Sequence, residues 1–119
     1  MLRNGVDIIE IERLEKIRPG IRARFINRVY TETEKEICGN NYACLAGRFA
    51  AKEAVSKVLG TGIGEIRWKD IEILRVEEGQ PIIKLHANAK LKEIELGIHH
   101  WAISISHGRT LAIAFVIAQ

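Results

Sequence analysis

The stretch from Arg48 to Lys57 constrains the fold of this chain more than any other part of the sequence. It is rich in Ala, Glu and Lys, which favour helix, and Gly60 is the first helix breaker after it. We therefore expect a helix that begins near Tyr42 and ends at Gly60. Apolar residues lie on nearly every side of this helix, which is typical of a buried helix.

Four charged residues lie inside this apolar helix and need an explanation. Arg48 and Lys52 are four residues apart on one stripe, and Glu53 and Lys57 are four apart on another. Charges in such a setting must be paired, bind a metal or face a ligand. The alternative is a surface helix in which Glu53 and Lys57 form an ordinary ion pair of about a few tenths of a kcal/mol.

The size and charge of the chain limit what it can be. Its 119 residues predict one small domain, residues 1–119, and a lone domain of this size buries only part of its surface, so we consider an oligomer. The net charge of +3 suits an acidic partner or a phosphorylated ligand. The two cysteines make no metal pattern, and with no signal peptide we expect reduced thiols and a cytoplasmic location.

The first thirty residues contain an acid in an apolar strand, followed by many arginines. Residues 5–11 read as a strand in which alternation puts Asp7 on the same side as Ile9 and Ile11, so Asp7 needs a partner unless it lies at an exposed sheet edge. Short helices are expected over 12–17, closed by Pro19 and Gly20, and over 22–30. Their arginines form either a docking patch for an acidic partner or a solvated basic face: Arg13, Arg18, Arg22, Arg24 and Arg28.

The remaining elements indicate an α+β fold in which a small antiparallel sheet packs on the central helix. Thr31 and Glu34 form a capping box that begins a helix ending near Cys38. Residues 66–77 and 81–86 predict a hairpin, residues 87–96 a helix, and residues 101–106 and 111–118 a second hairpin. Both strands of this second hairpin have a face of small Ala or Ser residues, which we expect to pack against the central helix.

Three sequence pieces together resemble one known family. They are Gly5-Val6-Asp7, the helix segment Arg-Phe-Ala-Ala-Lys-Glu-Ala from Arg48 through to Lys57, and Ser104-Ile105-Ser106-His107. In this order, and over the whole chain, they resemble the holo-acyl-carrier-protein synthase family of 4′-phosphopantetheinyl transferases. The resemblance implies transfer of the phosphopantetheine arm of coenzyme A to a serine of apo-acyl carrier protein, with release of adenosine 3′,5′-bisphosphate. It also implies a magnesium ion and a homotrimer with interfacial active sites.

The resemblance assigns roles to particular residues. Asp7 and Glu53 are the implied magnesium ligands, and Lys57 is the implied catalytic lysine. The implied coenzyme A contacts are Arg48, His107, the loop Gly60-Thr61-Gly62 with its extension to Gly64, and the turn at Gln80-Pro81. Arg13 and Arg24 are the implied contacts to the acidic carrier protein. The chain departs from the family pattern at Gln80, where a Lys is usual, at Gly108, where an acid is common, and at Leu111, where a Tyr is common.

The chemistry of these residues agrees with phosphoryl transfer, which depends on positioning and neutralisation of charge. Magnesium often takes one or two carboxylates plus phosphate oxygens and waters. Lys57 could pair with Glu53, but nothing nearby in sequence explains Asp7, so we expect one divalent ion between the two acids. The serine proton needs a base, which is either Glu53 or a metal-bound water.

Other interpretations of the same residues remain. The acids could form salt bridges with Lys52 or Lys57, and His107 could only satisfy backbone groups at a hairpin end. A non-catalytic coenzyme A or nucleotide-binding module would have no use for Glu53 and Lys57. An RNA-binding protein should interleave aromatic and basic residues, whereas aromatics are only 6% here and mostly follow apolar patterns.

Overall fold

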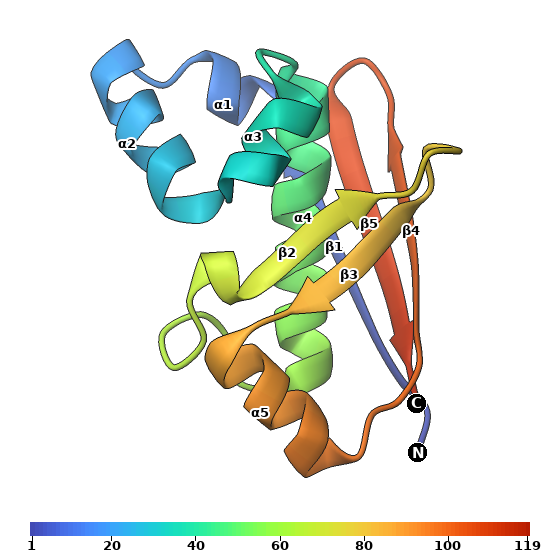
Figure 1. Ribbon diagram of the computed structural model, residues 1–119. Coiled ribbons are helices and arrows are strands. Elements are labelled where there is room, and N and C mark those ends of the chain that lie inside the picture. The colour runs from blue at the N-terminus through green and yellow to red at the C-terminus, as the bar shows by residue number, and fades with distance from the viewer.

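Helix α4 (Tyr42–Leu59) runs through the middle of the molecule, and the other elements pack around it (Figure 1). The computed structural model describes residues 1–119. Asn41 caps the start of α4 by accepting a hydrogen bond from the Cys44 N–H at 3.0 Å. Gly60 ends it with a left-handed φ of 75°. Both boundaries confirm the prediction from sequence.

One face of α4 is covered by a three-stranded antiparallel sheet. Its strand order is β1 (Arg3–Glu10), β5 (Leu111–Ala118) and β4 (Trp101–His107). Strand β1 passes so close to the helix that a Cβ on Gly5 would lie 2.2 Å from the carbonyl oxygen of Ala54, so only glycine fits there. The small side chains of β5 are buried on this same face: Ala112, Ala114, Val116 and Ala118.

Strand β4 presents its larger side chains to the helix, contrary to the prediction from sequence. A Cβ on Gly47 of α4 would lie 2.8 Å from the Cγ2 of Ile105, whereas Ser104 and Ser106 are exposed. The reason is geometric. Strands β1 and β5 lie directly over the helix, while β4 lies at the sheet edge and touches it less, so longer side chains are needed to reach the helix. The prediction was correct for β5 and wrong for β4.

The first predicted hairpin forms a separate two-stranded sheet. It contains β2 (Ile71–Arg75) and β3 (Pro81–Leu85), and α5 (Ala87–Leu96) follows it. The predicted strand over 66–77 is shorter because Asp70 accepts a hydrogen bond from the Arg67 N–H at 3.0 Å. This contact closes a short 3₁₀ helix, η1 (Trp68–Asp70). The α+β class is confirmed, with two sheets in place of one.

Three short helices connect β1 to α4. They are α1 (Glu12–Glu15), α2 (Pro19–Val29) and α3 (Glu32–Cys38). Pro19 stands in the first turn of α2, where its missing N–H costs nothing, so it opens this helix instead of closing the one before. The predicted capping box is confirmed, since Thr31 accepts from the Glu34 N–H and Glu34 accepts from the Thr31 N–H.

The two cysteines form a disulfide, which contradicts the expectation of free thiols. Cys38 ends α3, the chain turns at Gly39 with a φ of 55°, and Cys44 lies in the first turn of α4. This reversal brings the two Cα atoms to 5.3 Å, within the usual range for a disulfide. None of the helices combines the length and apolarity that a bilayer crossing requires.

Candidate active site

The two charged stripes of α4 face different surroundings. Glu53 and Lys57 lie on the side of strand β1, while Arg48 and Lys52 reach towards β2 and α3. One helix therefore supplies both a solvent-accessible charged group and a buried one. The ordinary surface pair of Glu53 with Lys57 is not formed.

Lys57 pairs with Asp7 across the helix–strand contact. Its Nζ lies 3.3 Å from Asp7 Oδ1 and donates to the Val6 carbonyl at 2.7 Å. The partner of Asp7 is thus not near it in sequence but 50 positions away, and the alternative salt bridge of this acid with Lys57 is formed. Gly5 makes this contact possible, since it lets β1 lie against α4 two residues before Asp7. The Lys57 side chain is 53% exposed, so the pair is open to solvent.

Glu53 lies beside this pair and has no side-chain hydrogen bond or ion pair. Its pKa is raised above the ordinary value by partial burial first and by the Asp7 carboxylate second, with Lys57 opposing the shift. Of the two acids, only Asp7 is paired with the lysine, and the unpaired Glu53 holds its proton more tightly. A divalent cation at this point would relieve the repulsion between Asp7 and Glu53.

No group of three or more His, Cys, Asp or Glu side chains lies close enough together to hold a metal ion. The protein alone would therefore offer a magnesium ion only these two carboxylates. This number still fits magnesium, which often takes one or two protein carboxylates and completes its shell with substrate phosphates and waters. The donor set is hard and anionic, which suits that ion.

Lys52 belongs to the core of the molecule. Its Nζ donates to Glu34 Oε1 at 2.8 Å and to the carbonyls of Trp68 and Ile71 at 3.1 and 2.6 Å. Both charged side chains of the pair are fully buried. Burial lowers the pKa of Lys52, and the Glu34 carboxylate opposes that shift. Sequence reasoning found the cap role of Glu34 but not this partner, because neither residue type nor spacing connects two positions 18 apart.

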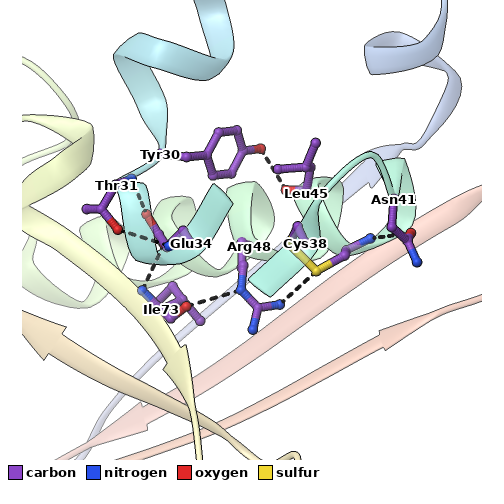
Figure 2. The surroundings of a disulfide bond; sticks show 9 residues. Tyr30, Thr31, Glu34, Cys38, Asn41, Leu45, Arg48 and Ile73 are labelled. Atoms are coloured by element: carbon purple, nitrogen blue, oxygen red, sulfur yellow. Dashed lines mark hydrogen bonds between the residues drawn. A yellow bond between two sulfur atoms is a disulfide. The ribbon is translucent and has the colours of Figure 1, made fainter. Parts of the chain in front are cut away.

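Arg48 is also nearly buried, with its guanidinium beside β2. Its Nε donates to the Ile73 carbonyl at 3.1 Å, and Nη1 donates to Cys44 Sγ at 3.3 Å. Figure 2 shows this side chain reaching from α4 to Ile73 on the strand. Burial lowers the pKa of Arg48, and the Glu34 carboxylate opposes that effect. The remaining guanidinium nitrogen, Nη2, makes no hydrogen bond within the chain. Arg48, which the resemblance implies as a contact to a coenzyme A phosphate, therefore keeps this donor available.

Gln80 and Pro81 line a hollow of about 710 Å³ between β3 and β4. The opposite wall comes from β4, including Ser104 and Ile105 of the third sequence piece. This volume is in the range of small-molecule sites, and most of the lining residues are apolar. The hollow therefore places the predicted contact Gln80-Pro81 beside the third sequence piece, but the predicted contact His107 is not part of its lining.

The loop Gly60-Thr61-Gly62 lies elsewhere, at the end of α4 next to α5. Thr61 lines a separate hollow of about 230 Å³ together with Asn88 and Lys92. Figure 1 places this loop and the β2–β3 turn at opposite ends of the molecule. His107 ends β4, is exposed, and approaches only the Gly108 carbonyl, with Nδ1 3.4 Å from it. A single chain thus does not gather all the predicted coenzyme A contacts.

The predicted basic patch borders an apolar hollow of about 330 Å³. Arg13 lines it, and Ile17, Phe25 and Phe49 supply apolar walls. Sequence reasoning did not select these apolar residues, because apolar positions in amphipathic helices are ordinarily core. Arg24 is exposed on α2 nearby. Arg22 is structural instead, since it donates to the carbonyls of Leu14, Glu15 and Ile17 and so ties α2 to α1.

Comparison with known proteins identifies the family. Residues 3–116 match the model of the 4′-phosphopantetheinyl transferase superfamily. The holo-[acyl-carrier-protein] synthase of Natranaerobius thermophilus is 47% identical over 95% of this chain and 93% of its own. That of Halothermothrix orenii is 46% identical over 97% of this chain and 94% of its own. The fold and the sequence agree, and the chain belongs to the holo-acyl-carrier-protein synthases of this superfamily.

Solved structures of the same family have the same fold. The Helicobacter pylori holo-[acyl-carrier-protein] synthase in complex with coenzyme A has a TM-score of 0.88 and 36% identity, over 98% of this chain and 99% of its own. The Neisseria meningitidis holo-[acyl-carrier-protein] synthase has a TM-score of 0.85 and 32% identity, over 98% of this chain and 97% of its own. The resemblance drawn from the three sequence pieces is confirmed.

Proposed function

We propose that this chain transfers the 4′-phosphopantetheine arm of coenzyme A to a serine of apo-acyl carrier protein and releases adenosine 3′,5′-bisphosphate. The observation that carries the proposal is the contact of Asp7 with Lys57 beside the unpartnered Glu53, in a chain of this family. These groups offer one cation and two anions at a solvent-accessible position. Phosphoryl transfer needs this kind of charge arrangement more than it needs covalent chemistry.

Asp7 and Glu53 are the residues that would hold a magnesium ion. When bound, that ion would neutralise charge on the pyrophosphate of coenzyme A. Lys57 would then leave Asp7 and turn its ammonium towards the transferred phosphate, where negative charge needs stabilisation. Its side chain is exposed enough to move, and its second contact is only to the Val6 carbonyl.

Glu53 is the carboxylate better suited to accept the serine proton. No side chain of the protein occupies its oxygens, so one oxygen could face the serine hydroxyl while the other holds the magnesium ion. Asp7, by contrast, already has one oxygen in contact with the Lys57 ammonium. We therefore assign the base role to Glu53 and a purely electrostatic role to Asp7.

Coenzyme A would bind in the hollow that Gln80 and Pro81 form with β4. Arg48 would use its free Nη2 on a phosphate, and His107 would contact another. Gly60, Thr61 and Gly62 lie too far away to join this hollow within one chain, which supports a site shared between subunits. Gln80 is neutral where the family usually has lysine, so we expect weaker contact to phosphate at this turn.

A homotrimer would complete the site and cover an apolar surface. The side of the sheet that faces away from α4 exposes five large apolar side chains: Val6, Ile8, Leu111, Ile113 and Phe115. Ile8 is 58% exposed and Phe115 43%, which is unusual for neighbouring strands of a small protein. Further copies of the same chain would bury this face and bring a loop from one subunit to the hollow of the next.

The carrier protein would dock on α1 and α2. Carrier proteins of this class are acidic by the family resemblance, so Arg13 and Arg24 would attract one by charge. The neighbouring hollow, with walls from Ile17, Phe25 and Phe49, would accept an apolar side chain of the partner. This combination of an apolar centre and a charged rim is common in protein interfaces.

The direct test is intact-mass spectrometry of apo-acyl carrier protein incubated with this protein, coenzyme A and magnesium. We expect a mass increase equal to one phosphopantetheine arm. The increase should be absent with the Glu53→Gln variant, and absent when the acceptor serine of the carrier protein is replaced by alanine. An unchanged mass under conditions where coenzyme A still binds would show a non-catalytic binding module and reject the proposal.

A further inference from the structure

The disulfide between Cys38 and Cys44 lies beside a residue of the proposed phosphate site. It closes the short connection between α3 and α4, and neither the sequence nor the family resemblance assigns it a role. Cys38 is buried at 6% exposure, whereas Cys44 is partly exposed and is therefore the more accessible residue of the two. The connection between them contains Gly39, Asn40 and Asn41, which are exposed and can adjust when the bond opens.

Cys44 lies in a setting that stabilises negative charge. Its Sγ accepts a hydrogen bond from Arg48 Nη1 at 3.3 Å, as part of the network around the disulfide drawn in Figure 2. It is also in the first turn of α4, an 18-residue helix whose N-terminal amides carry partial positive charge. A nearby guanidinium and a helix N-terminus both favour thiolate over thiol. No carboxylate makes an ion pair with Arg48; the buried Glu34 carboxylate acts on its charge from further away and is itself paired with Lys52.

We propose that Cys38 and Cys44 form a reversible redox pair that controls whether Arg48 is available to bind an anion. In the disulfide, the Cys44 sulfur is neutral and a weak acceptor, so the charge of Arg48 remains available to a phosphate. After reduction, the Cys44 thiolate neutralises Arg48 at contact distance. This consequence rests on the proposed function in one respect, namely that Arg48 contacts a phosphate of coenzyme A.

The redox step uses a dithiol reductant. One thiolate of the reductant attacks the accessible Cys44 sulfur, the Cys38–Cys44 bond breaks, and Cys38 leaves as a thiolate that takes a proton from water. The second thiol of the reductant then displaces Cys44 and closes the reductant's own disulfide. Two electrons pass from the reductant to the cysteine pair. A disulfide oxidant runs the same steps in reverse.

Two variants separate the thiolate from the simple loss of the cross-link. Cys38→Ala and Cys44→Ala both remove the disulfide, but only Cys38→Ala keeps a sulfur next to Arg48. Binding should be measured by calorimetry with adenosine 3′,5′-bisphosphate, because the thiol of coenzyme A itself would exchange with the disulfide. The protein should be studied at about pH 8, near the ordinary pKa of a thiol.

We expect the oxidised protein and Cys44→Ala to bind the bisphosphate with equal affinity. The reduced protein, desalted under argon, and Cys38→Ala should bind about tenfold more weakly, the loss of one charge-assisted contact. Equal affinity of Cys38→Ala and Cys44→Ala would overturn the proposal. So would a disulfide fraction, followed by maleimide labelling, that does not change across mixtures of reduced and oxidised glutathione.

The Arg48→Gln variant tests the underlying assumption separately. If it leaves the bisphosphate affinity of the oxidised protein unchanged, Arg48 is not a phosphate contact, and that part of the proposed function fails. The thiolate is tested without any nucleotide, by the rate at which iodoacetamide alkylates Cys44. Alkylation should be slower in Cys38→Ala/Arg48→Gln than in Cys38→Ala, and an equal rate would overturn the electrostatic coupling of Cys44 to Arg48.

Discussion

Lys57 Nζ lies 3.3 Å from Asp7 Oδ1, and Glu53, one turn back on α4, is left without a partner. The lysine therefore joins β1 to α4 at the point where the proposed reaction takes place. It also makes the two acids unequal, because Asp7 has a cationic partner and Glu53 has none. The first two predictions follow from this difference.

Glu53→Gln should abolish transfer and leave the fold intact. The variant also tests the raised pKa of Glu53, whose causes are burial and the Asp7 carboxylate. A raised pKa in the folded state means that this acid favours unfolding once it is ionised. The penalty is absent below the unfolded-state pKa of about 4.3, and it is fully present above the folded-state pKa.

The measurement is urea unfolding of both proteins from acid to neutral pH, without metal or coenzyme. Glu53→Gln should be the more stable protein at neutral pH, and the difference should vanish as the pH falls below about 4. Equal stability at every pH would mean that neither burial nor the Asp7 carboxylate raises the pKa of Glu53. Transfer at the wild-type rate would remove Glu53 from the catalytic residues.

Asp7→Asn should also abolish transfer, but its effect on stability should have the opposite sign. Asparagine cannot neutralise Lys57, so the variant loses an ion pair. Because Lys57 is 53% exposed and Asp7 22%, this loss should cost only about 0–1 kcal/mol. Turnover in the double variant Asp7→Asn/Glu53→Gln should fall little beyond either single variant, since groups that act as a unit are not additive. If the losses of turnover in the two single variants added up in the double variant across a magnesium titration, Asp7 and Glu53 would not share one magnesium site.

Lys52→Met should destabilise the protein by roughly 3–5 kcal/mol, because it leaves the Glu34 carboxylate buried without its cation. Glu34 and Lys52 are both fully buried, and Lys52 also satisfies the carbonyls of Trp68 and Ile71. Lys57→Met is the matched control on the same helix. It should change the unfolding free energy little and transfer strongly. A small effect of Lys52→Met on the unfolding free energy would refute the structural role of Lys52.

Phe115→Lys should prevent assembly of the trimer. Phe115 is exposed on the central strand β5, on the side of the sheet that faces away from α4. A charge there should be tolerated in the monomer but not in an apolar interface between subunits. Leu91→Lys is the matched control, because Leu91 is also an exposed apolar residue but lies on α5, away from this sheet. Multi-angle light scattering should give a trimer for the wild type and Leu91→Lys, and a smaller species for Phe115→Lys. If the wild-type protein were a monomer under assay conditions, the proposed trimer would be wrong.

The sequence predicted the helices and strands well, but it predicted poorly which distant residues pair with the charged side chains. The boundaries of α4 and the Thr31–Glu34 cap follow from local rules, and the structure confirms them. The partners of charged residues do not follow, since Lys52 with Glu34 and Lys57 with Asp7 are contacts between distant elements. Spacing along one helix favoured a Glu53–Lys57 pair, but packing against β1 offers Lys57 two acceptors at once. The same limit applies to the disulfide, which depends on the turn at Gly39.

Arg13→Glu/Arg24→Glu should weaken carrier-protein recognition and leave coenzyme A binding unchanged. Both arginines are exposed, and Arg13 borders the apolar hollow with walls from Phe25 and Phe49. Charges at the rim of an interface mainly set the association rate and its dependence on salt. The carrier-protein concentration at half-maximal rate should therefore rise most at low salt. The difference in this concentration between the variant and the wild type should become smaller as added salt screens the charges.

Two controls separate this effect from net charge and from the apolar hollow. Lys92→Glu on α5 makes the same change in charge as Arg13→Glu but far from α1 and α2 (Figure 1). Because Lys92 lines the hollow with Thr61, the kinetics are measured at saturating coenzyme A, where the dependence on carrier protein should be unchanged. Phe25→Ala should raise the same half-maximal concentration at every salt concentration, because loss of apolar contact is not screened. If Lys92→Glu were as harmful as Arg13→Glu, attraction would depend on the whole protein's charge. A fall in coenzyme A affinity on changing Arg13 and Arg24 would instead assign this patch to the nucleotide.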